Sequence, residues 1–448
     1  MSLLTPGAVR SPFAPELGGP RPEDLSRCVH CGLCSMSCPT FVETALEPES
    51  PRGRIALIRA VQENRIPLTE TVVQHLDLCL GCRNCEAVCP SGVPYGRIIE
   101  SARARIMETA PERTQAYRTR SRVLRALFPH PRRIALLAAL LRAYQESGVQ
   151  ALVRGSGVLR LLPRPLRELE TLTPHVSRHA FHVKRGVARA RGRATARVTL
   201  FAGCIMPYTH AETQRATLRV LRQTGCDVQT PVTQGCCGAL LLHNGDREAA
   251  RALARRNIDA FAPSGAQAIV VNAAGCGSAL KEYGELLADD PRYAERAEAF
   301  ADRVKDVTEF VAARPFQAGL GRVEARVTYQ DSCHLAHAQR VKAPPRQLIE
   351  AIPGVRLVEM EHADRCCGSA GIYNVVQREM SARLLALKMA DVAETAPELI
   401  VTANPGCMIQ LEAGVRQRGL HAEVLHVVDL LDRSYAAGSA AAARGGPA

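Results

Sequence analysis

The strongest constraint on this chain is a cysteine spacing that occurs twice near its start. Residues 28–39 read CVHCGLCSMSCP and residues 79–90 read CLGCRNCEAVCP, so both follow the pattern C-x2-C-x2-C-x3-C-P. Three cysteines in so tight a loop can bind one cube of iron and sulfide, while the fourth, before a proline, ligates a second cube. The repeated pattern therefore predicts two clusters that exchange their fourth ligands.

The same rule divides the eight cysteines between two [4Fe–4S] clusters. The expected sets are Cys28, Cys31, Cys34 and Cys89 for one cluster, and Cys38, Cys79, Cys82 and Cys85 for the other. Zinc sites usually take two Cys-x2-Cys pairs, not two sets of four that each end in proline. A module with two clusters passes single electrons, so the pattern indicates electron transport rather than substrate chemistry.

The second half of the chain repeats itself. Three segments recur at offsets of 129, 130 and 131 residues: RVTLFAGC and RVTYQDSC (197–204, 326–333), CCG (236–238, 366–368), IVVNAAGC and IVTANPGC (269–276, 400–407). Two copies of one unit are the simplest explanation. In each copy β-branched runs end at a cysteine and helical patterns follow, which predicts parallel α/β layers with cysteines beyond the carboxyl ends of the strands.

Each repeat offers four cysteines in the same order. They are Cys204, Cys236, Cys237 and Cys276 in the first repeat, and Cys333, Cys366, Cys367 and Cys407 in the second. Glycine after each adjacent pair would allow a sharp turn that points both thiolates at one metal centre. A further cluster or metal, a redox-active dithiol and buried structural thiols are all open at this point. Cys226 has no counterpart in the second repeat and is expected to be structural.

The positive charge is concentrated in one segment. Residues 101–200 hold 21 Lys and Arg against 5 Glu and no Asp, whereas the remaining 348 residues sum to −3. Such a block is typical of a solvated helical connector, or of a surface for anionic lipid or an acidic partner subunit. We expect no nucleic-acid partner, because the segment has few aromatic residues for base stacking.

The 17 cysteines and the hydropathy pattern indicate a cytoplasmic protein. No secretory signal is visible in the first 30 residues, and the longest aliphatic run near the middle, 134–141, is far below the ~20 residues that span a bilayer. Cytoplasmic cysteines serve metals or catalysis more often than disulfides. A peripheral position at the inner face of the membrane is compatible with the basic segment.

These features predict an α+β multidomain chain: a helical ferredoxin-like module with two [4Fe–4S] clusters, then an internally duplicated α/β cysteine-rich (CCG) domain. Helical patterns are expected over 53–64, 213–223, 247–261 and 378–393. The expected parts are a flexible leader (1–22), the two-cluster domain (23–100), a basic helical connector (101–195), CCG repeat 1 (196–320), CCG repeat 2 (321–435) and a disordered tail (436–448).

Taken together, the motifs resemble those of glycolate oxidase iron–sulfur subunits. The resemblance rests on CVHCGLCSMSCPTF, PRGRIALIRAV and HLDLCLGCRNCEAVCPSGV, and on the later pieces GCCGA, RRNIDA, GCGSALKEYG, RCCGSAGIY and IVTANPGC. These pieces extend over roughly residues 24–430, and their combination is much more specific than any one of them.

The resemblance implies an oxidoreductase complex, a glycolate dehydrogenase, in which this chain is the electron-transfer subunit. A partner subunit with FAD would oxidise glycolate to glyoxylate, and this chain would pass the electrons to a quinone or similar acceptor. We expect no catalytic acid or base here. Related complexes that oxidise lactate or glycerol 3-phosphate are the alternatives, and a cluster-containing nucleic-acid-binding protein is disfavoured.

One departure concerns the cysteine-rich repeat of heterodisulfide reductases, which ends in Cys-x2-Cys. The first of those positions is Ala273 in one repeat and Asn404 in the other. One potential thiolate is thus missing from each repeat, and the larger, non-cubane cluster of those enzymes is not expected. Four thiolates per repeat still suffice for one ordinary cluster.

Overall fold

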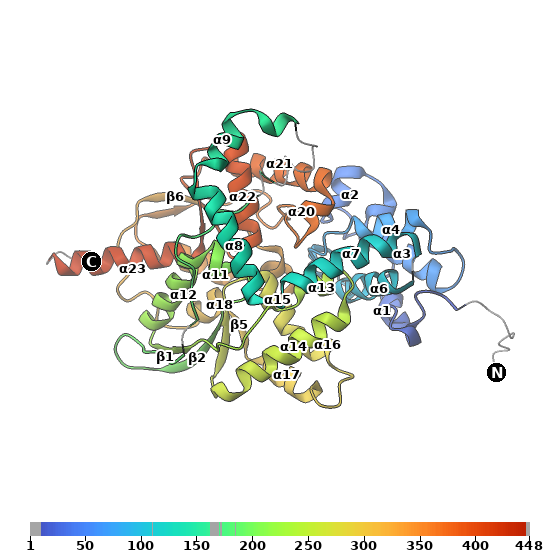
Figure 1. Ribbon diagram of the computed structural model, residues 1–448, viewed down its shortest axis with the longest axis horizontal. Coiled ribbons are helices and arrows are strands. Elements are labelled where there is room, and N and C mark those ends of the chain that lie inside the picture. The colour runs from blue at the N-terminus through green and yellow to red at the C-terminus, as the bar shows by residue number, and fades with distance from the viewer. Residues whose placement is uncertain (1–9, 110, 162–169, 171–172, 184, 445–448) are drawn as a thin grey trace. The chain divides into compact units, whose positions relative to one another are not determined.

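Contacts along the chain form two compact units (Figure 1). The computed structural model describes residues 10–109, 111–161, 170, 173–183 and 185–444. One unit runs up to Arg125 and also takes in Leu240–Ala250, and the other comprises Ala126–Ala239 and the chain from Arg251 on. Among the described residues, no helix has both the length and the apolar character needed to cross a bilayer.

The first unit is built from short helices. They are α1 (Pro22–Ser26), α2 (Pro39–Thr44), α3 (Pro51–Gln62), α4 (Glu70–Asp77), α5 (Asn84–Ala87), α6 (Tyr95–Thr109) and most of α7 (Pro111–Leu127), with 3-10 turns η1 (Pro15–Leu17) and η2 (Glu47–Glu49). Proline occupies the first position of α1, α2 and α3, where its missing N–H costs nothing. Ile58, Leu76 and Ile98 are fully buried at its centre.

Residues 10–22 pack onto this unit, which corrects part of the flexible leader predicted over 1–22. Phe13 is fully buried, and Ser11 Oγ donates to the Val61 carbonyl at 2.7 Å. Burying an aromatic ring offsets the entropy lost when the segment is ordered. Residues 1–9 lie outside the described residues.

A segment of the first repeat, Leu240–Ala250, also packs with this unit. Asp246 is fully buried and accepts from Arg125 Nη2 at 2.6 Å, and His243 Nδ1 lies 2.9 Å from Glu100 Oε1. Asn244 adds a hydrogen bond to the Tyr117 carbonyl. One arginine of the basic connector is therefore paired with a carboxylate of the repeat.

The second unit contains two sheets, one for each repeat. The first has the order β1-β3-β2-β4-β5, and the second has the order β7-β6-β8-β9. The strands are β1 (Val187–Ala188), β2 (Ala196–Phe201), β3 (Cys226–Gln229), β4 (Ala268–Val271), β5 (Val304–Asp306), β6 (Ala325–Tyr329), β7 (Val355–Leu357), β8 (Leu399–Thr402) and β9 (Glu423–His426). All pairs are parallel except β1 with β3, as the α/β prediction required.

Helices follow the strands of both repeats. The first repeat has α11 (Met206–Thr209), α12 (Ala211–Gln223), α13 (Ala239–His243), α14 (Arg247–Phe261), η4 (Ala262–Ser264), α15 (Ala274–Lys281), α16 (Tyr283–Leu286), α17 (Ala294–Asp302) and α18 (Val307–Ala312); the second has the π-helix η5 (His334–Ala338), α19 (Ala343–Glu350), α20 (Tyr373–Val376), α21 (Arg378–Glu394), α22 (Pro405–Arg418) and α23 (Val427–Ala443). Helices α21 and α22 lie side by side in Figure 1. The connector contributes α8 (Pro131–Glu146), α9 (Val149–Gly155) and η3 (Val158–Leu161).

One apolar core joins the two repeats. It includes Val198 and Val270 from the first sheet, Val327 and Val401 from the second, and Leu430 of α23. Helix α23 continues to Ala443, so residues 436–443 correct the disordered tail predicted over 436–448. Its backbone approaches the Gly319 carbonyl so closely that a Cβ on Gly438 would lie 2.2 Å from that oxygen, which anchors the helix end.

The last strand of each repeat leads directly into a capped helix. Asp306 Oδ1 accepts from Thr308 N at 2.8 Å at the start of α18, and His426 Nδ1 accepts from Val428 N at 3.1 Å at the start of α23. An imidazole can accept this hydrogen bond only while Nδ1 carries no proton. Burial, with a smaller contribution from His210, lowers the pKa of His426 to about 3.

This cap predicts a pH-dependent stability. Because the folded pKa of His426 lies below the unfolded value of about 6.5, its contribution is present above pH 6.5 and is lost as the pH falls toward 3. We expect His426→Asn, which keeps a capping oxygen, to remove about 2 kcal/mol of the stability difference between pH 7.5 and pH 5. Urea unfolding followed by circular dichroism measures it. His421→Asn, at an exposed histidine, is the control, and an unchanged pH dependence in His426→Asn would contradict this account.

Candidate functional site: four groups of thiols

The first group of thiols lies around one pocket in the first unit. The pocket is lined by the four cysteines predicted for the first cluster, Cys28, Cys31, Cys34 and Cys89, and also by Cys85. The loop can close because His30 and Gly32 have φ of 55° and 84°. A side chain at Gly32 would also meet the Arg52 guanidinium, since an added Cβ lies 2.5 Å from Nη1. His30 itself is exposed.

The second group is buried deeper in the same unit. Burial raises the pKa of the Cys85 thiol well above its usual range, and the thiols of Cys82, Cys79 and Cys38 raise it further. These neighbours are the members of the predicted second cluster. Gly81 N donates to Cys79 Sγ at 3.4 Å, and Tyr95 Oη donates to it at 3.6 Å.

Proline after the fourth cysteine has a local effect at Cys38. The residue is the N-cap of α2, and Pro39 occupies the first helical position. The Cys38 thiol there lies 3.3 Å from Thr40 Oγ1 and 3.5 Å from the Glu49 carbonyl.

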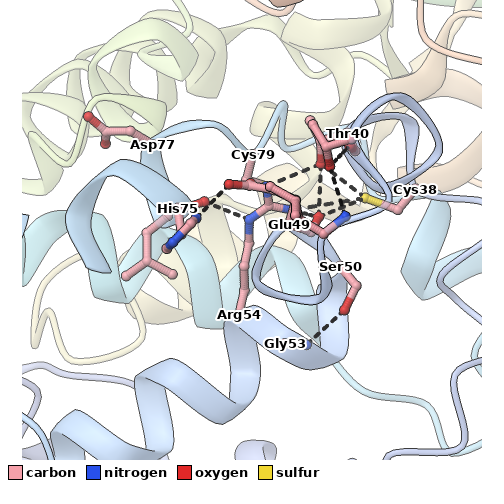
Figure 2. A network of polar contacts seen from close by, with 12 residues as sticks. Cys38, Thr40, Glu49, Ser50, Gly53, Arg54, His75, Asp77 and Cys79 are labelled. Carbon is pink, nitrogen blue, oxygen red and sulfur yellow. Dashed lines mark hydrogen bonds and ion pairs between the residues drawn. The ribbon is translucent and has the colours of Figure 1, made fainter. Parts of the chain in front are cut away.

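A buried arginine fills the space beside the second group (Figure 2). Arg54 is fully buried on α3 and pairs with Glu49, with Nη2 to Oε2 at 2.5 Å. Its other nitrogens donate to the carbonyls of Glu49 (2.6 Å) and His75 (2.7 Å), and Nη1 lies 3.9 Å from Cys38 Sγ. His75 Nδ1 in turn lies 2.5 Å from Glu49 Oε1. A single guanidinium thereby connects the start of α3, the end of α4 and a thiol.

In the first repeat, the four cysteines form one hydrogen-bonded group. Cys204 and Cys237 both hydrogen-bond to Cys236, and Cys237 also bonds to Cys276. These bonds hold the pKa of Cys236 well below its usual range and raise the pKa of Cys204 and Cys237. Gly238, with φ of 89°, makes the turn after the cysteine pair, and its N–H donates to Cys236 Sγ at 3.4 Å.

The second repeat forms the corresponding group. Cys366 bonds to Cys333 and Cys367, and Cys367 bonds to Cys407. The bond with Cys366, together with burial, raises the pKa of Cys367 to about 12. Gly368 has φ of 87°, and an added Cβ would lie 2.7 Å from the Ser381 carbonyl of α21, so only glycine fits this turn.

The two repeats meet near these groups. Ala274 N donates to the Ala403 carbonyl at 3.2 Å, and Gly275 N donates to Asn404 Oδ1 at 3.1 Å. Asn404 Nδ2 lies 3.6 Å from Cys407 Sγ. Asn404 occupies the position where heterodisulfide reductases have an additional cysteine. It connects the backbone beside Cys276 of the first repeat to the Cys407 thiol of the second repeat.

The donor sets suit clusters better than single ions. Within the described ranges, no three or more His, Cys, Asp or Glu side chains converge closely enough to hold one metal ion. Groups of four thiols fit a [4Fe–4S] cluster, which takes one thiolate on each iron. Cys226 is fully buried on β3 beside Thr224, apart from the four groups.

Comparisons with known families agree with this layout. Residues 24–93 match the family described as "4Fe-4S dicluster domain", and residues 198–281 and 327–412 each match "Cysteine-rich domain". Residues 117–173 match "Glycolate oxidase iron-sulfur subunit, linker region". The family matches thus follow the order of module, connector and duplicated domain.

Whole-chain relatives decide the family. The chain is 44% identical to the "Probable glycolate oxidase iron-sulfur subunit" of Bacillus subtilis, over 91% of this chain and 93% of the relative. It is 33% identical to the "Glycolate oxidase iron-sulfur subunit" of Escherichia coli, over 92% and 94%. The chain belongs to the glycolate oxidase iron–sulfur subunit family. A "Lactate utilization protein A" of Shouchella clausii is 29% identical over 52% of this chain and 98% of that protein.

Membership confirms several predictions for this glycolate oxidase iron–sulfur subunit homologue. The family resemblance, the α+β multidomain fold and the iron–sulfur cofactors are confirmed, the last by the dicluster and cysteine-rich domains. The assignment of individual cysteines to each cluster stays a prediction.

Two site residues were missed by the sequence analysis. Arg54 belongs to the family motif PRGRIALIRAV, and its visible signal was that it is the second arginine after a helix-starting proline. Lys388 lies on α21 next to the second CCG turn and is fully buried. Lysine is rare in this sequence, with 5 Lys against 52 Arg, so a lysine within a predicted helix was a signal that could have identified it.

The Arg54–Glu49 pair yields a stability prediction. Glu49→Gln leaves the Arg54 charge buried without its carboxylate, so we expect the free energy of unfolding to fall by about 3–5 kcal/mol and the clusters to be lost faster. Bleaching of the visible cluster absorbance during urea unfolding measures both. Glu47→Gln breaks the exposed Arg52–Glu47 pair nearby and is the matched control, with little expected change. Equal behaviour of the two variants would contradict the role given to Arg54.

Proposed function

We propose that this chain is the electron-transfer subunit of a glycolate dehydrogenase complex. The proposal rests on the family membership over 91% of the chain, together with the two groups of thiols in the first unit. Glycolate gives up two electrons when it becomes glyoxylate, whereas each [4Fe–4S] cluster, when bound, accepts and passes on one at a time. The substrate chemistry belongs to a flavin-containing partner subunit.

The proposed ligands follow the two groups of thiols in the first unit. Cys28, Cys31, Cys34 and Cys89 would hold the first cluster, and Cys38, Cys79, Cys82 and Cys85 the second. The shared pocket of the first set and the mutual proximity of the second support this assignment. Exposed Cys31 and half-buried Cys28 leave the first site nearer to solvent than the second, so the first is the better candidate for exchange with the partner.

Each CCG repeat is proposed to hold one additional cluster on its four cysteines. The hydrogen-bonded thiol groups support this, because four thiols that already lie together need little rearrangement to bind. We propose residues 196–320 and 321–435 as these two functional domains, after the dicluster domain at 23–100. The residues around the thiols exclude water and orient the sulfur atoms.

A membrane surface is the proposed location of the acceptor, a quinone. Helix α8 exposes Leu136, Leu137 and Leu140 on one face, each more than half exposed, and Arg133 lies one turn before them on that face. Leu152 of α9 is also exposed. Leucines beside arginines, with no acidic residue between 131 and 145, suit an anionic bilayer surface.

The proposed function predicts a defined loss on removing one ligand. In the complex purified with its partner, Cys89→Ser should lower the iron content by about four per chain and abolish glycolate-driven reduction of the remaining clusters. Cys226→Ser, which changes a buried cysteine outside the four groups, should keep both the iron content and the glycolate-driven reduction. Iron analysis and EPR after anaerobic addition of glycolate or lactate measure this. If lactate and not glycolate reduces the clusters, lactate replaces glycolate as the proposed electron donor. Fewer than about four irons per wild-type chain would refute the presence of two clusters.

The membrane proposal predicts that α8 controls vesicle binding. We expect Leu136→Ser with Leu140→Ser to weaken flotation with phosphatidylglycerol vesicles at least tenfold, because each buried leucine contributes about 1.5–3 kcal/mol. Arg132→Gln with Arg133→Gln should weaken it chiefly at low salt. Arg193→Gln with Arg197→Gln, at exposed sites outside the helix, is the charge-matched control. Equal flotation of the wild type and both α8 variants would rule out this surface.

A further inference from the structure

The two repeats place different residues beside their cysteine pairs. Helices α14 and α21 both begin with Arg-Glu and align at an offset of 131 residues. The alignment matches buried positions to buried positions: Ala250, Leu253, Ala254, Asn257, Ile258 and Phe261 with Ser381, Leu384, Leu385, Lys388, Met389 and Val392. The pair that differs in charge is Asn257 and Lys388. A neutral amide in the first repeat thus corresponds to a cation in the second.

In the first repeat, the neutral side-chain amide of Asn257 forms hydrogen bonds with the backbone of the CCG turn. Asn257 Nδ2 donates to the Cys236 carbonyl at 2.9 Å, and its Oδ1 accepts from Gly235 N at 2.9 Å. Tyr283 Oη donates to the Cys237 carbonyl at 2.8 Å. These hydrogen bonds hold the CCG turn and add no charge.

In the second repeat, the buried ammonium has only carbonyl partners at close range. Lys388 Nζ donates to the carbonyls of His362 (2.5 Å) and Ala363 (3.2 Å), four and three residues before the CCG turn. In the part of the chain that the structure describes, no carboxylate oxygen lies within 4 Å of Nζ. Cys366 and Cys367 are among its charged neighbours when their thiols ionise.

The nearest carboxylates already face other basic side chains. Asp391 lies 3.7 Å from Arg365 and 3.9 Å from His362, and Asp364 lies 3.8 Å from Lys342 and 3.6 Å from His337. Arg365 itself precedes the second CCG turn, where the first repeat has Gly235. Two cations, Arg365 and Lys388, therefore lie close to the second CCG turn.

A buried ammonium without a counter-ion is unfavourable, because its hydration is lost and no opposite charge replaces it. Burial accordingly lowers the pKa of Lys388, while Asp391 and Cys367 oppose that shift. Four thiolates around a cluster would supply the missing negative charge. The reduced form carries one more negative charge than the oxidised form, so a nearby cation stabilises it more.

We propose that Lys388 is the counter-ion of an iron–sulfur cluster in the second repeat and sets the reduction potential of that cluster above that of the first repeat. This inference rests on the proposed occupation of the repeats. The step it affects is a one-electron exchange: the first-repeat site is oxidised by one electron, the second-repeat site is reduced by one, and no bond forms or breaks. Asn404, which hydrogen-bonds beside Cys276 and to Cys407, offers a short path between them.

The test is an EPR-monitored redox titration of the anaerobically purified full chain. A Cys333→Ser variant identifies the signal of the second repeat. We expect Lys388→Gln to shift the reduction equilibrium of that signal at least tenfold toward the oxidised form, about 59 mV for one electron, with unchanged iron content. Lys388→Arg should keep the wild-type midpoint. Lys305→Gln, which removes a half-exposed lysine of the same unit, is the charge-matched control.

The outcomes separate this inference from the function on which it rests. If Lys388→Gln does not fold, Lys388→Met is the second neutral variant, and the same shift is expected. Full iron with an unchanged midpoint in a neutral variant overturns the role of Lys388 and leaves the clusters in place. Wild-type protein with only about eight irons and no signal sensitive to Cys333→Ser overturns the occupation of the repeats, and this inference with it, while the two N-terminal clusters stand.

Discussion

Negative charge on buried sulfur is the constraint to which the rest of this structure responds. Thiolates in an apolar interior are stable only when cations, N–H dipoles or a metal centre lie close to them. In the first unit, Arg54 lies beside Cys38 and is itself held by Glu49. In the second repeat, the buried cation is Lys388, which donates to carbonyls just before the CCG turn, and in the first repeat the buried groups that hold the turn, Asn257 and Tyr283, are neutral. The three surroundings differ in the buried side chain nearest the thiols, and such differences tune the reduction potentials of clusters.

The duplicated α/β unit explains why the thiol groups have the same geometry and different surroundings. Parallel strands bring their carboxyl ends to one edge, so cysteines after β2 and β4, or after β6 and β8, meet there by topology alone. The glycines after each cysteine pair make the turn that both copies need. The helices behind these turns are free to diverge, and it is there that an amide in one copy corresponds to an ammonium in the other.

Polar groups in the interior of this subunit serve structure and charge rather than acid–base chemistry. Buried Asp306 and His426 cap helices, and Asp246 binds Arg125. Asn404 joins the two repeats through the backbone beside one cysteine and the thiol of another. This use of polar residues is consistent with a subunit that carries electrons while a partner performs the oxidation, as the proposed function has it.

Spacing along the chain was enough to predict a cluster-binding role for the eight N-terminal cysteines, the twofold repeat, and the helices at 247–261 and 378–393. These features depend on neighbours within a few residues or on direct repetition. Contacts between distant segments could not be read in this way. Arg54 became significant only where α3, α4 and Cys38 meet, Leu240–Ala250 joined the other unit through Asp246, and Phe13 and Gly438 were ordered by partners far along the sequence. The sequence determined which residues can bind metal, and the tertiary structure decided which charges surround them, because electrostatic energy depends on distance in space and on burial.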